Sequence, residues 1–314
     1  MNMKSMRTYT VLGTAMLFLS SCLFVSSGWA DERDVLSFVS LKDKTRPIIL
    51  MDTQEKILQR LVIPGLRPLS FSWSPDGRSF TYHTNTEGLN FDIYVMDVET
   101  QTHRQLTFDG SRDIWPAWSP NGKWISFASD RAGTSDFYRI DIDGGNLMKL
   151  TDGQDYDKTA WSPDSQWIAF TSRGSLFVMN AEGKRLRRLA GSANSVDCTW
   201  SPDGKQIAFS SNRDIFSIDL NGRNLRQLTP IDQRAWDLEW SPSGEWIAYR
   251  VRDILGDLVI GVVNTIDNKR GGVLETTRGL VPSHLDWVPE GFLSVSPSAE
   301  KQTTLWGRLK QKVD

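Results

Sequence analysis

Large apolar and small residues alternate in short segments that recur along the chain. In each segment two large apolar residues stand two positions apart, with Thr, Ser or Ala between them. A period of two predicts a β-strand, because successive side chains of a strand point to opposite faces of its sheet. The pairs are Phe80/Tyr82, Ile125/Phe127, Ile168/Phe170, Ile207/Phe209 and Ile247/Tyr249.

A tryptophan and a turn close to Ser-Pro-Asp-Gly precede each alternating segment. Proline presets φ at the second turn position, and Asp and Gly tolerate the conformations that follow. Five clear copies and one degenerate copy succeed one another at roughly 40 residues, which is the period of a four-stranded propeller blade. The lead tryptophans are Trp73, Trp118, Trp161, Trp200, Trp240 and Trp287.

Two further strands complete the predicted repeat. The third is marked by sequences such as DIYVMD and DFYRID. The fourth is short and basic, as suits an outer edge where positive charge discourages pairing with other chains. Third strands are predicted at Asp92–Asp97, Asp136–Asp141, Ser175–Asn180 and Asp214–Asp219, and fourth strands at Arg104–Thr107, Met148–Thr151, Arg187–Ala190 and Arg226–Thr229.

The two ends of the chain are predicted to share the last blade. Three strands without the motif precede the first lead tryptophan, at Val35–Ser40, Pro47–Asp52 and Ile57–Val62. No full set of strands follows Trp287. Joining the early strands to the Trp287 segment closes a ring, and a ring buries both faces of every blade. The sequence therefore predicts an all-β, six-bladed β-propeller of four-stranded antiparallel blades over residues 31–300, with a tail at 301–314.

Residues 1–30 have the pattern of a signal peptide. Lys4 and Arg7 precede an apolar stretch at residues 11–25, and the small residue Ala30 offers a cleavage point. The sequence LSSC, which ends at Cys22, also resembles a bacterial lipobox. Lipidation of Cys22 and an uncleaved anchor are therefore alternatives to cleavage after Ala30. Each alternative predicts an exported protein of the periplasm or cell envelope.

Charge and cysteine content narrow the expected partners. The net charge is −2 and no basic run follows the signal, which argues against a nucleic-acid partner. Membrane contact is expected only through the signal or a lipid on Cys22. Cys198 is the other cysteine of the sequence, so no internal disulfide is expected, and its thiol should be packed and inert. No cofactor or metal is expected, because the calcium-like stretch Asp141–Asn146 lacks the remaining acidic ligands.

The repeated unit WSPDGxxIAFxSxR, followed by DIYxxD and RQLT, resembles the TolB-type propeller repeat of bacterial periplasmic proteins. The resemblance covers roughly residues 35–295 and implies a six-bladed ring with a role in protein interaction. Full TolB proteins also carry an α/β domain before the propeller. Strands are predicted in its place here, so that domain is not expected and the Tol–Pal partners do not carry over. The sequence has no GxSxG elbow of the peptidases that carry a similar propeller.

The residue three positions before each lead tryptophan differs from repeat to repeat. Because these positions are matched in the scaffold, their side chains are expected to ring one mouth of the central channel. Such variation is what a site built in loops on a rigid frame would show, although loops that only solvate the rim would vary as well. The positions are Ser70, Trp115, Lys158, Asp197, Asp237 and His284, with Asp113, Asp157 and Trp236 in the same connecting loops.

The favoured function is that of a monomeric binding or scaffold protein whose channel mouth contacts another envelope protein or a peptide. Trp115 and Trp236 are amphipathic and are expected to anchor the partner. Asp113, Asp197 and Asp237 are expected to supply polar contacts.

The alternative function is that of an enzyme with its active site at the same mouth, a hydrolase or lyase acting on carbohydrate or peptide. Lys158, Asp197, Asp237 and His284 would be its acid–base candidates. A deep pocket with shifted pKa values near His284 would favour the enzyme. A broad, shallow aromatic rim would favour the binding protein.

An arginine follows the second strand in four repeats, and an acidic residue comes soon after it in most of them. The repetition favours an ion pair that fixes the loop over a clamp for a ligand. Arg131 and Asp136 illustrate the expected pairing.

Overall fold

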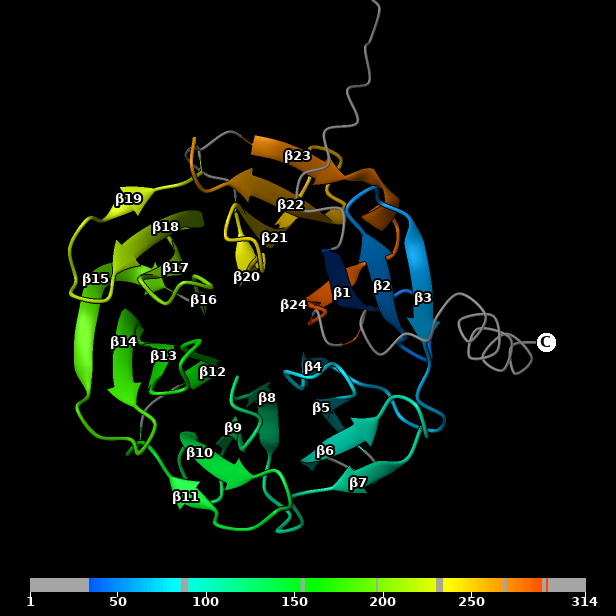
Figure 1. The fold of residues 1–314 in the computed structure, drawn as a ribbon, viewed down its shortest axis with the longest axis vertical. Coiled ribbons are helices and arrows are strands. Elements are labelled where there is room, and N and C mark those ends of the chain that lie inside the picture. The colour runs from blue at the N-terminus through cyan, green and yellow to red at the C-terminus, as the bar shows by residue number, and fades with distance from the viewer. Residues whose placement is uncertain are drawn as a thin grey trace, which may run out of the picture.

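The computed structural model describes residues 34–85, 90–153, 156–195, 197–229, 234–267, 270–289 and 292. The predicted signal at residues 1–30, with Cys22, and the predicted tail at 301–314 lie outside these ranges. The described chain forms six four-stranded sheets that radiate from a central channel as the blades of a propeller (Figure 1). This arrangement confirms the predicted all-β fold. No helix in the described ranges is long and apolar enough to cross a membrane.

Each of the first five blades runs outward from an inner strand that ends at a lead tryptophan (Figure 1). Blade 1 contains β4 (Ser70–Trp73), β5 (Ser79–Asn85), β6 (Phe91–Asp97) and β7 (His103–Gln105). Blade 2 contains β8 (Asp113–Trp118), β9 (Trp124–Ser129), β10 (Asp136–Asp141) and β11 (Met148–Lys149). Blade 3 contains β12 (Tyr156–Trp161), β13 (Trp167–Ser172), β14 (Gly174–Asn180) and β15 (Arg187–Ser195).

The next two blades repeat this order, and a 3-10 helix then leads the chain back to the channel. Blade 4 contains β16 (Asp197–Trp200), β17 (Gln206–Ser211), β18 (Asp214–Asp219) and β19 (Arg226–Gln227). Blade 5 contains β20 (Trp236–Trp240), β21 (Trp246–Arg252), β22 (Leu258–Asn264) and β23 (Arg270–Leu274), and η1 (Glu275–Thr277) follows.

Blade 6 joins the two ends of the described chain, as predicted. β1 (Val35–Ser40) lies between β24 (Pro282–Trp287) and β2 (Ile48–Asp52), and β3 (Ile57–Leu61) forms the outer edge. Figure 1 shows the blue early strands beside the orange β24. Ser37 fastens this blade to blade 1, because its hydroxyl accepts a hydrogen bond from the Trp73 indole at 2.9 Å.

The outer strands of blades 1, 2 and 4 are shorter than predicted, for a local reason. The threonine at the end of the predicted strand uses its side chain rather than its backbone to bind the third strand. Thr107, Thr151 and Thr229 accept hydrogen bonds through Oγ1 from the backbone of β6, β10 and β18 at 2.8–3.0 Å. The backbone ladder therefore ends two residues earlier than predicted in each of these blades.

The hydrophobic core lies between neighbouring blades. Four of the residues that stand two positions before a lead tryptophan belong to this core and are at most 1% exposed, namely Phe71, Cys198, Leu238 and Leu285. Cys198 packs with Leu176 and other residues of blade 3, and it forms no disulfide within the described residues. The structure thus confirms that Cys198 is a packed core residue.

The Ser-Pro-Asp-Gly turns are built alike from blade to blade. In blade 4, the Ser201 hydroxyl donates to Asp203 at 2.7 Å and accepts a hydrogen bond from the Gln206 backbone at 2.9 Å. Blade 3 repeats both contacts around Ser162, at 2.6 and 2.9 Å. The turn fixes the geometry between the first and second strands, so all the inner strands reach the channel in the same way.

One loop interaction differs from the prediction. Arg131 binds Asp113 at 2.8 Å and Asp109 at 3.1 Å, whereas Asp136 binds Lys149. Arg131 reaches back toward the inner strand because its guanidinium stacks over Phe127 and Tyr138 of its own blade. The ion pair joins the loop to β8 rather than to β10.

Candidate functional site

A cavity of about 370 Å³ lies at the channel end where the inner strands begin. We call it the mouth pocket. All six residues of the varied column line it, and each comes from a different inner strand. The convergence predicted from the sequence is therefore present in the structure. The lining residues are Leu69, Ser70, Trp115, Lys158, Asp197, Trp236, Asp237, Arg250, Ser283 and His284.

The backbone departs from regular β-structure where this pocket is built. The ladders of β8, β12, β20 and β24 each shift register at the residue of the column. Trp115, Asp237 and His284 there have φ between 52° and 58°. A one-residue bulge re-aims a side chain, and positive φ in residues other than glycine is costly and concentrates at functional sites.

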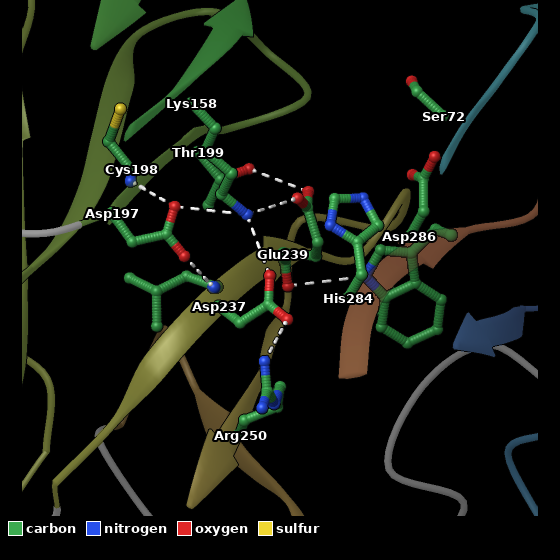
Figure 2. A network of polar contacts seen from close by, with 12 residues as sticks. Ser72, Lys158, Asp197, Cys198, Thr199, Asp237, Glu239, Arg250, His284 and Asp286 are labelled. Carbon is green, nitrogen blue, oxygen red and sulfur yellow. Dashed lines mark hydrogen bonds and ion pairs between the residues drawn. The ribbon is translucent and has the colours of Figure 1, made fainter. Parts of the chain in front are cut away.

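Lys158 crosses the channel to carboxylates of two other blades (Figure 2). Its Nζ lies 3.1 Å from Asp197, 3.0 Å from Asp237 and 3.6 Å from Glu239. Burial opposes its charge, but the three carboxylates outweigh burial and raise the pKa of Lys158 well above its ordinary value. Lys158 therefore ties blade 3 to blades 4 and 5 with a charge that is largely shielded from water.

Asp237 is held between two cations. One oxygen contacts Lys158, and the other accepts a hydrogen bond from Nη1 of Arg250 at 3.2 Å (Figure 2). The Arg250 guanidinium in turn lies over the Trp236 ring, 5.4 Å from its centre. Although burial favours the neutral acid, Lys158 and Arg250 lower the pKa of Asp237 below its ordinary value.

The pKa of Asp197 is raised rather than lowered, although Asp197 also contacts Lys158. Burial raises its pKa to about 6, in spite of the lysine and of backbone hydrogen bonds from Cys198 at 2.8 Å and Leu238 at 2.6 Å. The pocket thus holds two carboxyl groups whose environments move their pKa values apart. Such a pair is the usual arrangement for separate acid and base roles.

Two histidines at the channel mouth, the buried His83 and the half-buried His284, stay neutral. The His284 ring donates through Nε2 to the carbonyl of Phe71 at 2.5 Å, and burial lowers its pKa to about 4. His83 of β5 accepts a hydrogen bond through Nδ1 from Ser70 at 2.6 Å. Burial, with repulsion between its protonated form and the neighbouring His284 and Arg112, lowers the pKa of His83 to about 3.

A second cavity, of about 350 Å³, occupies the other end of the channel. Lead tryptophans and turn prolines line it, together with the carboxyl groups of Glu239 and Asp286. Burial raises the pKa of Glu239 well above its ordinary value and that of Asp286 to about 7. Trp115, Lys158 and His284 line both cavities, so they form the partition between them.

One predicted site residue, Asp113, does not line the mouth pocket. Asp113 is fully buried in its ion pair with Arg131. Asp157 belongs to β12, but its side chain lies outside the described part of the structure. Partner binding by any residue of the predicted site stays a prediction.

Sequence reasoning missed four ionisable residues of the channel. Glu239 and Asp286 stand one position before their lead tryptophans, on the same strand face as the varied column, so the period of two could have found them. His83 and Arg250 stand ten positions after theirs, where the other repeats have Ala128, Thr171 and Ser210. The same search for varied matched positions would have identified this second column.

Within the described residues, no set of three or more His, Cys, Asp or Glu side chains is arranged to hold a metal ion. The carboxylates that meet in the channel surround Lys158 instead.

Fold and pocket together define a six-bladed β-propeller with a polar pocket at one mouth of its channel. The family model of the TolB beta propeller domain matches residues 12–175, just over half of the sequence. The chain belongs to this family. An uncharacterized protein of Agrobacterium fabrum is 31% identical over 93 residues. That match covers 30% of this chain and 31% of the relative, so the chain spans about a third of the relative's length.

Solved structures share the fold at low sequence identity. TolB from Acinetobacter baumannii has a TM-score of 0.66 at 22% identity, over 83% of this chain and 68% of that one. A putative TolB from Agrobacterium tumefaciens has a TM-score of 0.57 at 18% identity, over 77% and 87% of the two chains. A chain of a nidogen/laminin complex has a TM-score of 0.65 at 12% identity, over 81% and 98%.

Proposed function

We propose that this protein is exported to the cell envelope and binds a partner protein or peptide at the mouth pocket. The observation that carries the proposal is the convergence on one cavity of six side chains, of five residue types, from matched scaffold positions. Membership of the TolB propeller family supports an interaction scaffold. The pattern of residues 1–30 supports export.

The half-buried tryptophans of the pocket suit the anchoring role. Trp115 and Trp236 line the cavity and are neither fully buried nor fully exposed. Partly exposed aromatic rings in a pocket are typical binding hot spots, because they offer a large apolar area at low entropic cost. The buried charges beneath them hold the floor of the pocket rigid.

Site-specific photo-crosslinking in the native cell tests this proposal. A photoreactive phenylalanine analogue replaces Trp115 or Trp236, and matched controls carry it at Leu186 or Leu225, exposed positions in the turns at the opposite end of the blades. We expect one shared crosslinked partner from both mouth positions and none from the controls. Equal crosslinking from both ends of the propeller would contradict the proposal.

Export is tested separately on the same cells. The mass of protein purified from the envelope fraction distinguishes a mature chain that starts at Asp31 from one that starts at a lipid-modified Cys22. Recovery of the unprocessed chain in the cytosol alone would contradict export.

A second candidate function, an enzyme of the mouth pocket, is favoured by the divergent pKa values of Asp197 and Asp237. Asp197 would act as the acid and Asp237 as the ionised partner, on a carbohydrate or peptide substrate. The test is release of reducing ends or free amines from mixed polysaccharides and peptides, by the wild-type protein and by Asp197→Asn. Release that disappears in the variant would favour the enzyme over the scaffold.

A further inference from the structure

Two tryptophans of the mouth pocket have indole N–H groups that the described protein does not use. Five of the six lead tryptophans, by contrast, donate theirs to an acceptor within the described structure. Within the same ranges, nothing accepts a hydrogen bond from Nε1 of Trp115 or of Trp236, although both residues line the cavity. Neither atom is closed off from solvent. The pocket therefore offers indole donors to a ligand.

His284 supplies an acceptor to the same pocket. Its Nε2 donates to the carbonyl of Phe71, so the other ring nitrogen, Nδ1, carries the lone pair. Burial lowers the pKa of His284 to about 4, so Nδ1 stays an acceptor at neutral pH. No described group donates to Nδ1, and this atom too is open to solvent. Edge-to-face contact with Phe71, at 5.3 Å between ring centres, fixes the direction of the imidazole.

The donor of Trp236 and the acceptor of His284 come from neighbouring blades. Trp236 begins β20 and His284 lies on β24, and these two inner strands are adjacent in the ring (Figure 1). The guanidinium of Arg250 covers one face of the Trp236 ring, 5.4 Å from its centre, and holds the indole in place. Trp115 stands across the channel on β8. One side of the pocket thus has a donor and an acceptor, and the other side has an aromatic ring.

The charged side chains of the pocket are matched among themselves. Lys158 contacts Asp197 and Asp237, and Arg250 contacts Asp237. Nε of Arg250 is buried, so the guanidinium cannot present its Nε–Nη2 edge to a carboxylate. A charged ligand would lose its hydration without meeting an unpaired opposite charge. The indole and imidazole groups are neutral, and so they favour a neutral polar ligand.

We propose that the partner inserts the side-chain amide of an asparagine or glutamine into the mouth pocket. The amide oxygen accepts the hydrogen bond of Trp236 Nε1, the amide nitrogen donates to Nδ1 of His284, and the aliphatic stem packs on Trp115. A carboxamide is the neutral side-chain group that carries an acceptor and a donor side by side. This inference rests on the proposed function and names the group that the mouth pocket recognises.

Fluorescence anisotropy with two sets of labelled Gly/Ser peptides tests the proposal. The central residue is Gln, Glu or Met in one set and Asn, Asp or Leu in the other, so the members of a set are alike in shape and differ in hydrogen bonding and charge. In at least one set, the amide peptide should bind at least about tenfold more tightly than both companions, because each companion leaves a polar group of the pocket unpaired. A smaller preference in both sets, or no saturable binding, would overturn the proposal.

Two tryptophan substitutions separate the donor from the aromatic ring. Trp236→Phe removes the indole N–H and keeps a ring, so it should weaken binding of the amide peptide by about tenfold and remove the preference for the amide. Trp124→Phe removes the same group from a half-buried tryptophan at the other end of blade 2 and should leave binding unchanged. Equal losses from the two variants, or an unchanged preference in Trp236→Phe, would overturn the assignment of the donor.

NMR of nitrogen-labelled histidine rings follows the acceptor directly. The sequence has three histidines, and the signals of His284 are those that His284→Gln lacks. In the wild type, the Nδ1 signal should shift when the amide peptide is added and stay in place with the Met or Leu peptide, because only the amide donates to the lone pair. An Nδ1 signal that the amide peptide does not move would overturn the assignment of the acceptor.

Chitotriose tests another source of an amide, an N-acetylated sugar. If chitotriose displaces the labelled amide peptide more effectively than the unlabelled peptide does, the ligand is a glycan and the peptide assignment is wrong. Failure of the amide preference with intact crosslinking from Trp115 and Trp236 would overturn the amide alone, since covalent capture does not depend on that preference. Loss of the crosslinks themselves would overturn the proposed function.

Discussion

The two ends of the inner strands are built on opposite principles. At the tryptophan end, the turns of blades 1, 3 and 4 repeat the same serine and aspartate contact, and blades 2 and 5 keep the serine with Asn121 or Ser243 in place of the aspartate. At the mouth end, the matched residues differ, and four of the strands bulge. Regular turns set the geometry of the ring, and this leaves the other end free to vary without loss of closure.

The ion pairs at the two ends also differ, in how far they are buried. Lys205 pairs with Asp203 at 3.1 Å in a turn, with 80% of the lysine side chain exposed. Lys158 pairs with Asp197 at the same distance in the channel, with 14% exposed. The two pairs are chemically alike, so a comparison of their substitutions isolates the effect of burial.

Lys158→Met should have the largest effect. The variant removes the cation that Asp197, Asp237 and Glu239 share. An unpaired buried charge costs about 3–5 kcal/mol. The free energy of unfolding, measured with urea at neutral pH, should fall by about that amount. Part of the loss should return in mild acid, where the carboxyl groups can be neutral. A loss below about 1 kcal/mol would show that the channel network does not hold the blades together.

Asp286→Asn should change the pH dependence of stability. Burial raises the pKa of Asp286 in the folded protein to about 7, above its unfolded value of about 4. The folded state therefore binds the proton more tightly, and this contribution is present in acid and lost as pH rises from about 4 through 7. As the pH rises from about 5 to 8, the free energy of unfolding of the variant should increase by on the order of 2 kcal/mol relative to that of the wild type. Asparagine can still accept the hydrogen bond that the Trp73 backbone donates at 3.0 Å.

Asp203→Asn at the turn end is the control for this pH series. The hydrogen bond from Ser201, with others from the backbone, lowers the pKa of Asp203. Its contribution is present above the unfolded pKa of about 4 and is lost only at lower pH. The difference in unfolding free energy between Asp203→Asn and wild type should thus stay constant from pH 5 to 8. A slope as steep as that of Asp286→Asn would contradict the contrast between the two ends.

The sequence was sufficient for the ring and for the position of the mouth pocket. Alternation and the tryptophan period are local signals, so they predicted the strands, and unpaired early strands predicted the shared blade. The sequence also predicted that Trp115 and Asp237 face the channel mouth, because each stands three positions before its lead tryptophan. The ion pair of Asp113 with Arg131 could not be predicted, because the bulge after Ile114 and the stacking of Arg131 on Tyr138 decide it. Bulges depend on packing across the channel, which no single repeat contains.

Ser162→Ala and Ser201→Ala should have smaller effects, and equal ones. Each substitution removes a hydroxyl that bonds an aspartate and a backbone N–H in a buried part of a turn. Loss of the two hydrogen bonds, one of them to a charged but exposed aspartate, should lower the free energy of unfolding by about 1–2 kcal/mol in either blade. Urea unfolding of both variants checks this. If the losses of unfolding free energy in the two variants differ by more than the expected loss itself, the turns are not equivalent.

Lys205→Met should have the smallest effect and completes the comparison with Lys158. The pair it breaks is as short as the channel pair, but water solvates both partners once they separate, and exposed pairs contribute about 0–1 kcal/mol. The urea midpoint should shift little, and raising the salt concentration should remove what shift there is. Asp203 would keep its hydrogen bonds from Ser201 and the backbone, so the turn should hold its shape. A loss as large as that of Lys158→Met would mean that burial is not what makes the channel lysine important.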